Sequence, residues 1–330
     1  MRESTVRIPA WESANSLEAN IETNLEVIDD AIRAPQMVDL LETWQLTSPT
    51  DRSDEMLDWL AGVADEYWDF RKGRERNQVG EVEFTQDQTC AIDAASAVLG
   101  LQTPTIPARS YYDVAFVLGG LLRGCLTRWR MAQELMRNGV DMGWVVGLGG
   151  TRMLTPPEEE QGCVLGIGAT TEFDAMVQAL RLTFHPQCHC EYESHEEPEL
   201  PNANWAVMRY DSTTPRLAVV AAPSSEPESR RANTADTIEW WLQRIGVVPG
   251  QSNLLITSQI YVPYQASVAV RTLGLTQNTT VEFAGVTPSA GDLGEVTQKF
   301  QCHHYLQEIG STIRGYHQLR KALVKAQGRL

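Results

Sequence analysis

The chain has 330 residues, 42% of them hydrophobic, which is enough for one large domain with a substantial core plus a smaller appendage. Asp and Glu number 43 against 27 Lys and Arg, so the net charge is −16. That charge argues against a general role in binding nucleic acid or an anionic membrane surface, although it is compatible with a local basic pocket.

The sequence shows no signal for membrane insertion or secretion. No stretch approaches the ~18 consecutive apolar residues of a membrane span, and residues 1–7 lack the apolar core of a secretory signal. The six cysteines are irregularly spaced, which is typical of reduced thiols rather than of a disulfide framework. We therefore expect a cytoplasmic protein.

Residues 1–105 predict a helical N-terminal region. Leu17, Ile21 and Leu25 recur at steps of four residues, as expected of a buried helix face. The acidic, Trp-rich segment 55–70 is interpreted as packing against the rest of the protein. The alternative is that this helical region presents a surface for a protein partner or for self-association.

Residues 106–330 predict an α/β domain, because short apolar runs alternate with helical segments long enough for right-handed crossovers. This alternation favours a doubly wound, mostly parallel sheet. A last helix, 305–324, is expected to pack on the sheet. The predicted strands are 113–118, 144–148, 216–222, 253–257 and 281–286, and the predicted helices between them are 127–138, 172–184, 234–245 and 265–273.

An acidic insertion at about 185–204 interrupts this alternation and is predicted to lead into a hairpin of 205–210 and 216–221. It gathers His and Cys residues, but its Cys-x-Cys spacing lacks the Cys-x-x-Cys pairs of common zinc folds. A solvated loop is the favoured interpretation, and a metal site is the alternative. The residues concerned are His185, Cys188, His189, Cys190 and His195.

Two polar loops, 230–236 and 257–261, follow predicted strands that we expect to be neighbours. Ligands of open α/β sheets bind beyond the carboxyl ends of the strands, so the two loops predict one binding site. Asn233 and Asp236 resemble a capping pair. Arg230 and Arg231 fit capping poorly, because cations are unfavourable at a helix start without an acidic ligand or side chain nearby.

Glycine pairs end the first two strands, and arginines follow each pair. Glycine lets backbone N–H groups approach a ligand closely, and arginine supplies a cationic fork for phosphate or carboxylate. Neither pair is a P-loop or a complete dinucleotide motif, so structural turns are the alternative interpretation. The residues are Gly119, Gly120, Arg123, Arg128 and Arg130 after the first strand, and Gly149, Gly150 and Arg152 after the second.

Glu172 begins the helix that follows, with Thr170 or Thr171 as its N-cap. Its carboxylate is a candidate for binding a ribose hydroxyl or for general base catalysis, and the alternative is a residue favoured only by the helix dipole. The sequence Gly-x-Ser-x-Gly does not occur, which argues against a serine hydrolase of the nucleophile-elbow type.

Across residues 113–286 the chain resembles the bacterial YdcF, SanA and ElyC family, which has a Rossmann-like domain. The ordered pieces are the two glycine-ended strands, an Arg and an Ala on the first helix, the Thr-Glu-Phe helix start, the Arg-Ala-Asn-Thr-Ala-Asp-Thr segment and the Ile-Thr-Ser strand end. They stand at 117–120, 128, 132, 148–150, 171–173, 231–237 and 256–258.

The sequence departs from the family where the family has a His and an Arg after Thr-Ser, because Tyr261 and Tyr264 stand in that neighbourhood. Asp236 and Thr237 replace a Glu and an Asn. The N-terminal helical region and the Cys/His insertion are additional to the family core. Chemistry that needs the family's His is therefore not expected here.

The resemblance implies a pocket for a nucleotide-like ligand, with S-adenosylmethionine first among the candidates. The leading hypothesis is a cytoplasmic enzyme that binds this ligand and transfers a group to a second, small substrate, and the residues favour no metal. The alternative is a non-catalytic ligand sensor or scaffold, and a weaker one is a phosphoester or glycosidic hydrolase. The predicted catalytic residues are Glu172 and Arg128, and the predicted ligand-binding residues are Gly119, Gly120, Arg123, Gly149, Gly150, Arg152, Arg231, Asn233, Thr234, Thr257, Ser258 and Tyr261.

Overall fold

The computed structural model describes residues 6–70, 82–246, 248 and 250–328. Its internal contacts divide the chain into two compact units. The helical unit contains residues 1–105, 259–271 and 299–330, and the α/β unit contains residues 106–258 and 272–298. The sequence analysis had placed 259–271 and 299–330 in the α/β domain. Among the described residues, no helix is both long and apolar enough to cross a membrane.

The helical unit is built from amphipathic helices whose starts are fixed by local caps. Ser16 caps the first helix and Thr85 forms a capping box with Gln88 at the fourth. The elements are α1 (Leu17–Ile32), α2 (Pro35–Glu42), α3 (Ser53–Val63), a π-helical turn (Ala64–Trp68), α4 (Gln86–Val98), a 3-10 turn (Gln259–Tyr261), α9 (Val262–Ala269) and α11 (Cys302–Gln327). A second π-helical turn, Val270–Leu275, follows α9.

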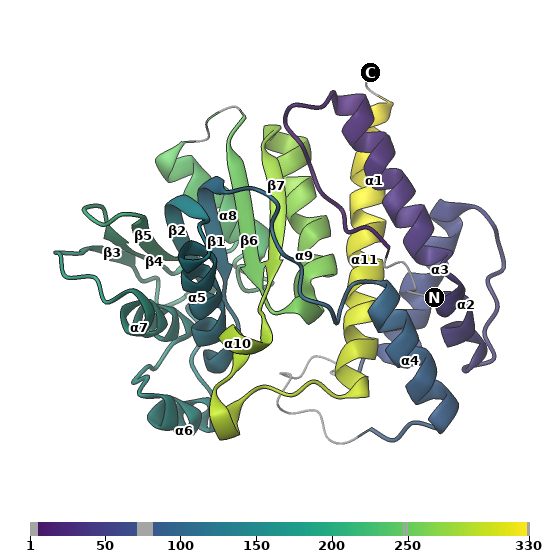
Figure 1. Cartoon of the computed structure of the whole chain (residues 1–330), viewed down its shortest axis with the longest axis horizontal. Helices are drawn as coiled ribbons and strands as arrows, with labels where there is room; N and C mark the ends of the chain where they lie inside the picture. The colour runs from purple at the N-terminus through teal and green to yellow at the C-terminus, as the bar shows by residue number, and fades with distance from the viewer. Residues whose placement is uncertain (1–5, 71–81, 247, 249, 329–330) are drawn as a thin grey trace. The chain divides into compact units, whose positions relative to one another are not determined.

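The long helix α11 packs against α1, α3, α4 and α9, whereas the sequence analysis expected it on the sheet (Figure 1). Its apolar stripe, including Leu306, Ile309 and Ile313, is buried. Arg320 on its polar side contacts Asp29 of α1 at 2.9 Å and Asp54 of α3 at 2.6 Å. The apolar stripe predicted burial correctly, and the charges on α1 and α3 complement those on α11.

The α/β unit contains a seven-stranded, mostly parallel sheet in the order β3-β4-β5-β2-β1-β6-β7 (Figure 1). Without β3 and β4, this is the Rossmann-like order, in which the chain starts in the middle and reverses direction between β1 and β6. The predicted strands and hairpin are confirmed. The bounds are β1 Tyr111–Leu118, β2 Asp141–Gly149, β3 Glu191–His195, β4 Trp205–Tyr210, β5 Arg216–Ala221, β6 Ser252–Thr257 and β7 Thr280–Gly285.

Helices cover both faces of this sheet, as the doubly wound prediction requires. On one face α5 (Leu122–Arg137) and α7 (Glu172–Phe184) share a buried core with β1, β2 and β5. On the other face α8 (Thr234–Ile245) places Trp241 against Trp144 of β2, with ring centroids 5.4 Å apart. Because neighbouring side chains on a strand point to opposite faces, Trp144 and Val145 serve different layers.

Two helices and one strand of the α/β unit were not predicted from the sequence. The helix α6 (Pro156–Leu165) lies between β2 and α7, and the short α10 (Pro288–Gly291) follows β7. The acidic insertion, expected as a solvated loop, contributes the edge strand β3, which pairs antiparallel with β4. Every residue of β3 is exposed, so its sequence carries no alternating pattern that would predict a strand.

Candidate functional site

The predicted glycine turn after β1 lies at the point where the strand order reverses. Gly119 and Gly120 follow the end of β1, and Ser258 follows β6, the neighbouring strand on the other side of the reversal. Gly120 has φ of +150°, in a region of backbone conformation that favours glycine. This edge is where ligands of Rossmann-like sheets bind.

Arg128 connects the end of β1 with the residue that follows β6. It is only 4% exposed, and its Nη1 donates to the carbonyl oxygens of Leu118, at 2.7 Å, and of Gly119. Its Nη2 donates to the Ser258 Oγ at 3.3 Å. The guanidinium therefore holds the glycine turn and the end of β6 in fixed positions while carrying a positive charge into the site.

The Glu172 side chain folds back over the ends of β1 and β2. A Cβ atom on Gly119 would overlap its Oε1, and a Cβ on Gly150 would lie 3.4 Å from its Oε2. The side chain is 16% exposed. Burial raises the pKa of this carboxyl above its usual value, and Arg152, Arg128 and Arg231 oppose that rise without cancelling it. Three cations from three segments thus act on the pKa of one carboxyl, and Arg152 is in direct contact with it.

Arg152 connects Glu172 to α6. Its Nη1 and Nη2 donate to the two carboxylate oxygens of Glu158 at 2.8 and 2.9 Å, and its Nε lies 3.4 Å from Glu172 Oε2. Burial raises the pKa of Glu158, but bonds from Arg152 and Thr155 outweigh it and leave that pKa lowered. The sequence analysis missed Glu158, although Thr155, the following prolines and Gly166 are recognisable start and stop signals of a helix.

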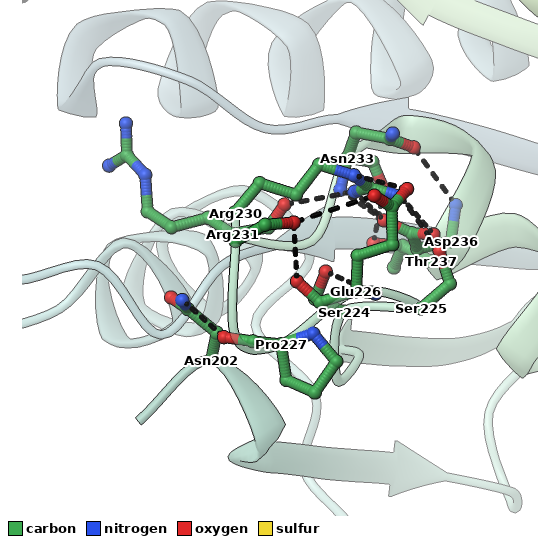
Figure 2. A network of polar contacts seen from close by, with 11 residues as sticks. Asn202, Ser224, Ser225, Glu226, Pro227, Arg230, Arg231, Asn233, Asp236 and Thr237 are labelled. Atoms are coloured by element: carbon green, nitrogen blue, oxygen red, sulfur yellow. Dashed lines mark hydrogen bonds and ion pairs between the residues drawn. The ribbon is translucent and has the colours of Figure 1, made fainter. Parts of the chain in front are cut away.

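The segment between β5 and α8 is occupied by its own polar network (Figure 2). Asn233 Oδ1 accepts from the Asp236 backbone N–H at 3.1 Å, and Asp236 Oδ2 accepts from that of Asn233 at 2.8 Å. Arg230 donates to Asp236 at 2.5 and 3.2 Å and contacts Glu226 at 3.2 Å. The acidic partner that Arg230 was predicted to need is therefore a side chain of this chain.

The Arg231 side chain extends away from this network, although its backbone carbonyl oxygen accepts from Arg230 at 3.1 Å. Figure 2 shows its guanidinium pointing away from the Arg230 and Asp236 cluster, and its charge lowers the pKa of Glu172. The expectation that 230–236 and 257–261 follow neighbouring strands is wrong, because β2 and β1 lie between β5 and β6. Both loops still leave the same edge of the sheet, since these four strands are parallel.

The remaining predicted site residues lie as follows. Thr171 is the N-cap of α7, forming a capping box with Asp174. Arg123 is the second residue of α5, Thr234 is the first of α8, and Thr257 is the buried last residue of β6. Gly149 ends β2, where a Cβ would lie 3.2 Å from Phe173 Cα. Tyr261 belongs to the helical unit, where its ring contacts Phe300 at 6.0 Å between centroids.

The described residues contain no group of three or more His, Cys, Asp or Glu side chains arranged to hold a metal ion. The Cys and His residues of the insertion instead lie in the segment leading into β3 and in β3 itself.

The architecture and the strand-end cluster define a mixed α/β protein with a Rossmann-like sheet, and comparisons relate the chain to mycobacterial proteins. Residues 15–100 match the family model of the Rv3785 N-terminal domain. The chain is 34% identical over 233 residues to uncharacterized protein Rv3785 of Mycobacterium tuberculosis H37Rv and to uncharacterized protein Mb3814 of Mycobacterium bovis. These matches cover 68% of this chain and 64% of each relative, so the chain spans less than two thirds of their length. No solved structure matches the chain significantly.

Proposed function

We propose that the protein is a cytoplasmic enzyme that binds a nucleotide-like small molecule at the ends of β1, β2 and β6 and transfers a group to a second small substrate. The observation that carries this proposal is the position of Glu172 over Gly119 beside the strand-order reversal, where Arg152 contacts it and Arg128 and Arg231 also oppose the rise of its pKa. Each arginine comes from a different segment, so the fold gathers them there. Such convergence of charge at this edge of the sheet is typical of a ligand site.

Glu172 is the residue best suited to proton transfer. Its raised pKa brings the carboxyl closer to neutral pH, where a general base works most effectively. Arg128 is fixed by three hydrogen bonds, so it offers a preorganised positive charge to a ligand or to a developing negative charge. In this proposal Glu172 accepts a proton from the attacking group or holds a ribose hydroxyl, and Arg128 and Arg231 hold the anionic part of the ligand.

S-adenosylmethionine is the first ligand to test, because the resemblance to the YdcF branch suggests it. The arginines favour a ligand with a carboxylate or phosphate, and S-adenosylmethionine has a carboxylate. Nucleotides and sugar phosphates fit the same charge pattern. The site is therefore proposed for this chemical class, with the adenosyl compound as its leading member.

A thermal-shift panel tests the proposal, comparing S-adenosylmethionine, S-adenosylhomocysteine, nucleotides and nucleotide sugars. A ligand at 100 times its Kd should stabilise the folded state by about 2.7 kcal/mol. We expect stabilisation that is lost in Glu172→Ala and kept in Glu159→Gln, which changes an exposed carboxyl on α6. A shift that persists in Glu172→Ala would place the ligand elsewhere, and no shift with any compound would reject the ligand class.

The second candidate is a non-catalytic ligand sensor or scaffold. One observation favours it, since Arg128 and Arg152 already bind groups of the protein itself, which is how structural arginines behave. Turnover separates the two functions, because an enzyme consumes a second substrate, whereas a sensor changes only its shape or its partner affinity on binding.

A further inference from the structure

A second site lies away from the Glu172 cluster, where the C-terminal end of α7 meets the segment leading into β3. It is a pocket of about 380 Å³ within the α/β unit. Two thiols, a guanidinium and a phenol face it. Its lining residues are Arg181, His185, Pro186, Gln187, Cys188, Cys190 and Tyr210.

Cys188 and Cys190 are both half-buried and both line this pocket. Cα atoms two residues apart are separated by at most about 7 Å, and disulfides bridge Cα atoms about 4.4–6.8 Å apart. This spacing is compatible with a disulfide between the two cysteines.

Arg181 is held beside one of these thiols. Its Nε donates to Tyr210 Oη at 3.0 Å, which fixes the guanidinium at the pocket wall. Its pKa is raised first by that hydrogen bond and also by Cys190. Arg181 and both thiols line the same pocket, so a small disulfide with an anionic group can meet the guanidinium and the thiols together. We assign Cys190 as the attacking residue and Cys188 as the one that resolves.

We propose that Cys188 and Cys190 form a thiol–disulfide exchange site for low-molecular-weight disulfides. The Cys190 thiolate attacks one sulfur of the disulfide, whose S–S bond breaks, and the departing thiolate takes up the proton that Cys190 released. The Cys188 thiolate then attacks the Cys190 sulfur and expels the second thiol in the same way. The two cysteines are oxidised to an internal disulfide, and the small disulfide is reduced to two thiols.

A tetrahedral zinc site is the competing use of these residues, and it needs three or four protein ligands. The described part of the chain offers no such group of three, whereas an internal disulfide needs only the two thiols. The exchange chemistry is independent of the proposed function at Glu172.

The test treats the reduced full-length protein with oxidised glutathione and maps its tryptic peptides without reduction. Residues 182–209 form one peptide that contains both cysteines, and it should lose two hydrogen atoms and become protected from alkylation. Excess reduced glutathione should restore it. The exposed Cys163 lies in a different peptide and serves as a matched control for simple accessibility.

Single variants separate the two roles. In Cys188→Ser, Cys190 should accumulate as a mixed disulfide with glutathione, and in Cys190→Ser, Cys188 should react more slowly. Stable mixed disulfides in the wild-type peptide, or no reaction there while Cys163 reacts, would overturn the proposal. The wild-type measurement alone decides this outcome, so it does not depend on the folding of either variant.

Discussion

Gly119 is the residue on which the geometry of the proposed site depends most directly. The end of β1 lies so close to β2 and to the Glu172 side chain that a Cβ here would overlap both the Leu148 carbonyl oxygen and Glu172 Oε1. A backbone carbonyl in a paired strand cannot move aside as a surface side chain can. Glycine is thus required at this position for space rather than for an unusual φ.

We predict that Gly119→Ala destabilises the protein by about 1–3 kcal/mol, the usual range for overpacking, and displaces the Glu172 carboxylate. Urea unfolding measures the first effect. Gly139→Ala is the control for packing, because no atom lies within 4 Å of its Cβ position. Its φ of +88° means that this variant loses some stability through backbone strain alone. Equal ligand-induced thermal shifts in wild type and Gly119→Ala would show that the turn does not shape the site.

Glu172→Gln tests the electrostatic account of the same cluster. Because the folded-state pKa of Glu172 is raised, its ionisation destabilises the folded protein as the pH rises above the ordinary Glu range, near 4.5. Glutamine cannot ionise, so the free energy of unfolding of the variant relative to wild type should increase between about pH 4 and about pH 7. Glu159→Gln, at an exposed position, should show no such trend, and a falling difference for Glu172→Gln would contradict the raised pKa.

At the scale of elements, a strongly buried ion pair joins α6 to Arg152 in the loop that follows β2. The Glu158 side chain is 3% exposed, and its two carboxylate oxygens accept hydrogen bonds from Nη1 and Nη2 of Arg152. Removing Glu158 takes away both of the carboxylate oxygens that accept from Arg152 Nη1 and Nη2. We predict that Glu158→Ala costs about 3 kcal/mol at neutral pH, measured by urea unfolding.

Measuring the same loss of stability at lower pH tests whether it is electrostatic. Since the folded-state pKa of Glu158 is lowered, its stabilising contribution is present above the ordinary Glu range and disappears as the pH falls through the folded-state pKa. The difference between wild type and Glu158→Ala should therefore shrink in acid. A difference that does not change with pH would assign the loss to packing instead of charge.

Asn233 was predicted to bind a ligand, but its role as the N-cap of α8 also explains its presence. Its side chain caps α8 through the Asp236 backbone N–H. Asn233→Ala should destabilise the protein by about 1 kcal/mol, and Asn233→Asp, which keeps an accepting oxygen, should lose less. If ligand-induced stabilisation falls in Asn233→Ala but the stability without ligand does not, the residue is a ligand contact and not a cap.

The helices and strands also show which parts of the fold could be predicted from sequence patterns. The strands of the parallel sheet were predicted because they are buried apolar runs, and α7 and α8 because caps precede periodic stripes. The helix α6 was missed because it buries only Glu158 and Gly162, which leaves no apolar stripe. Of the predicted site, the convergence of Glu172 with Arg128 and Arg152 was foreseeable from strand ends, whereas the Arg230 and Asp236 pair depended on side-chain directions that no spacing encodes.

At the scale of the whole molecule, the helical unit is assembled from three segments that are far apart in the sequence, residues 1–105, 259–271 and 299–330. Its N-terminal helices place apolar residues against α11, which lies about two hundred residues further along the sequence. The apolar stripe of α11 showed that it would be buried, but a stripe does not identify the surface it meets. Residues 15–100, which match the Rv3785 N-terminal domain, therefore do not include α11, which contributes to the core of the helical unit.

We predict that a fragment of residues 6–105 has low helicity by circular dichroism, because the face normally covered by α11 is exposed to water. Mixing it with a peptide of residues 299–328 should restore helicity and give a cooperative thermal transition. A fragment 6–105 that unfolds cooperatively without the peptide would show that α11 is dispensable for its folding.

This discontinuity sets an order of events during synthesis. Residues 106–298, which contain the whole α/β unit, emerge from the ribosome before residues 299–330. Domains usually fold from the N-terminal end as the chain grows. We therefore expect α1, α3 and α4 to expose the faces that α11 covers until residues 302–327 have been translated. The α/β unit, although translated second, is the one that can finish first.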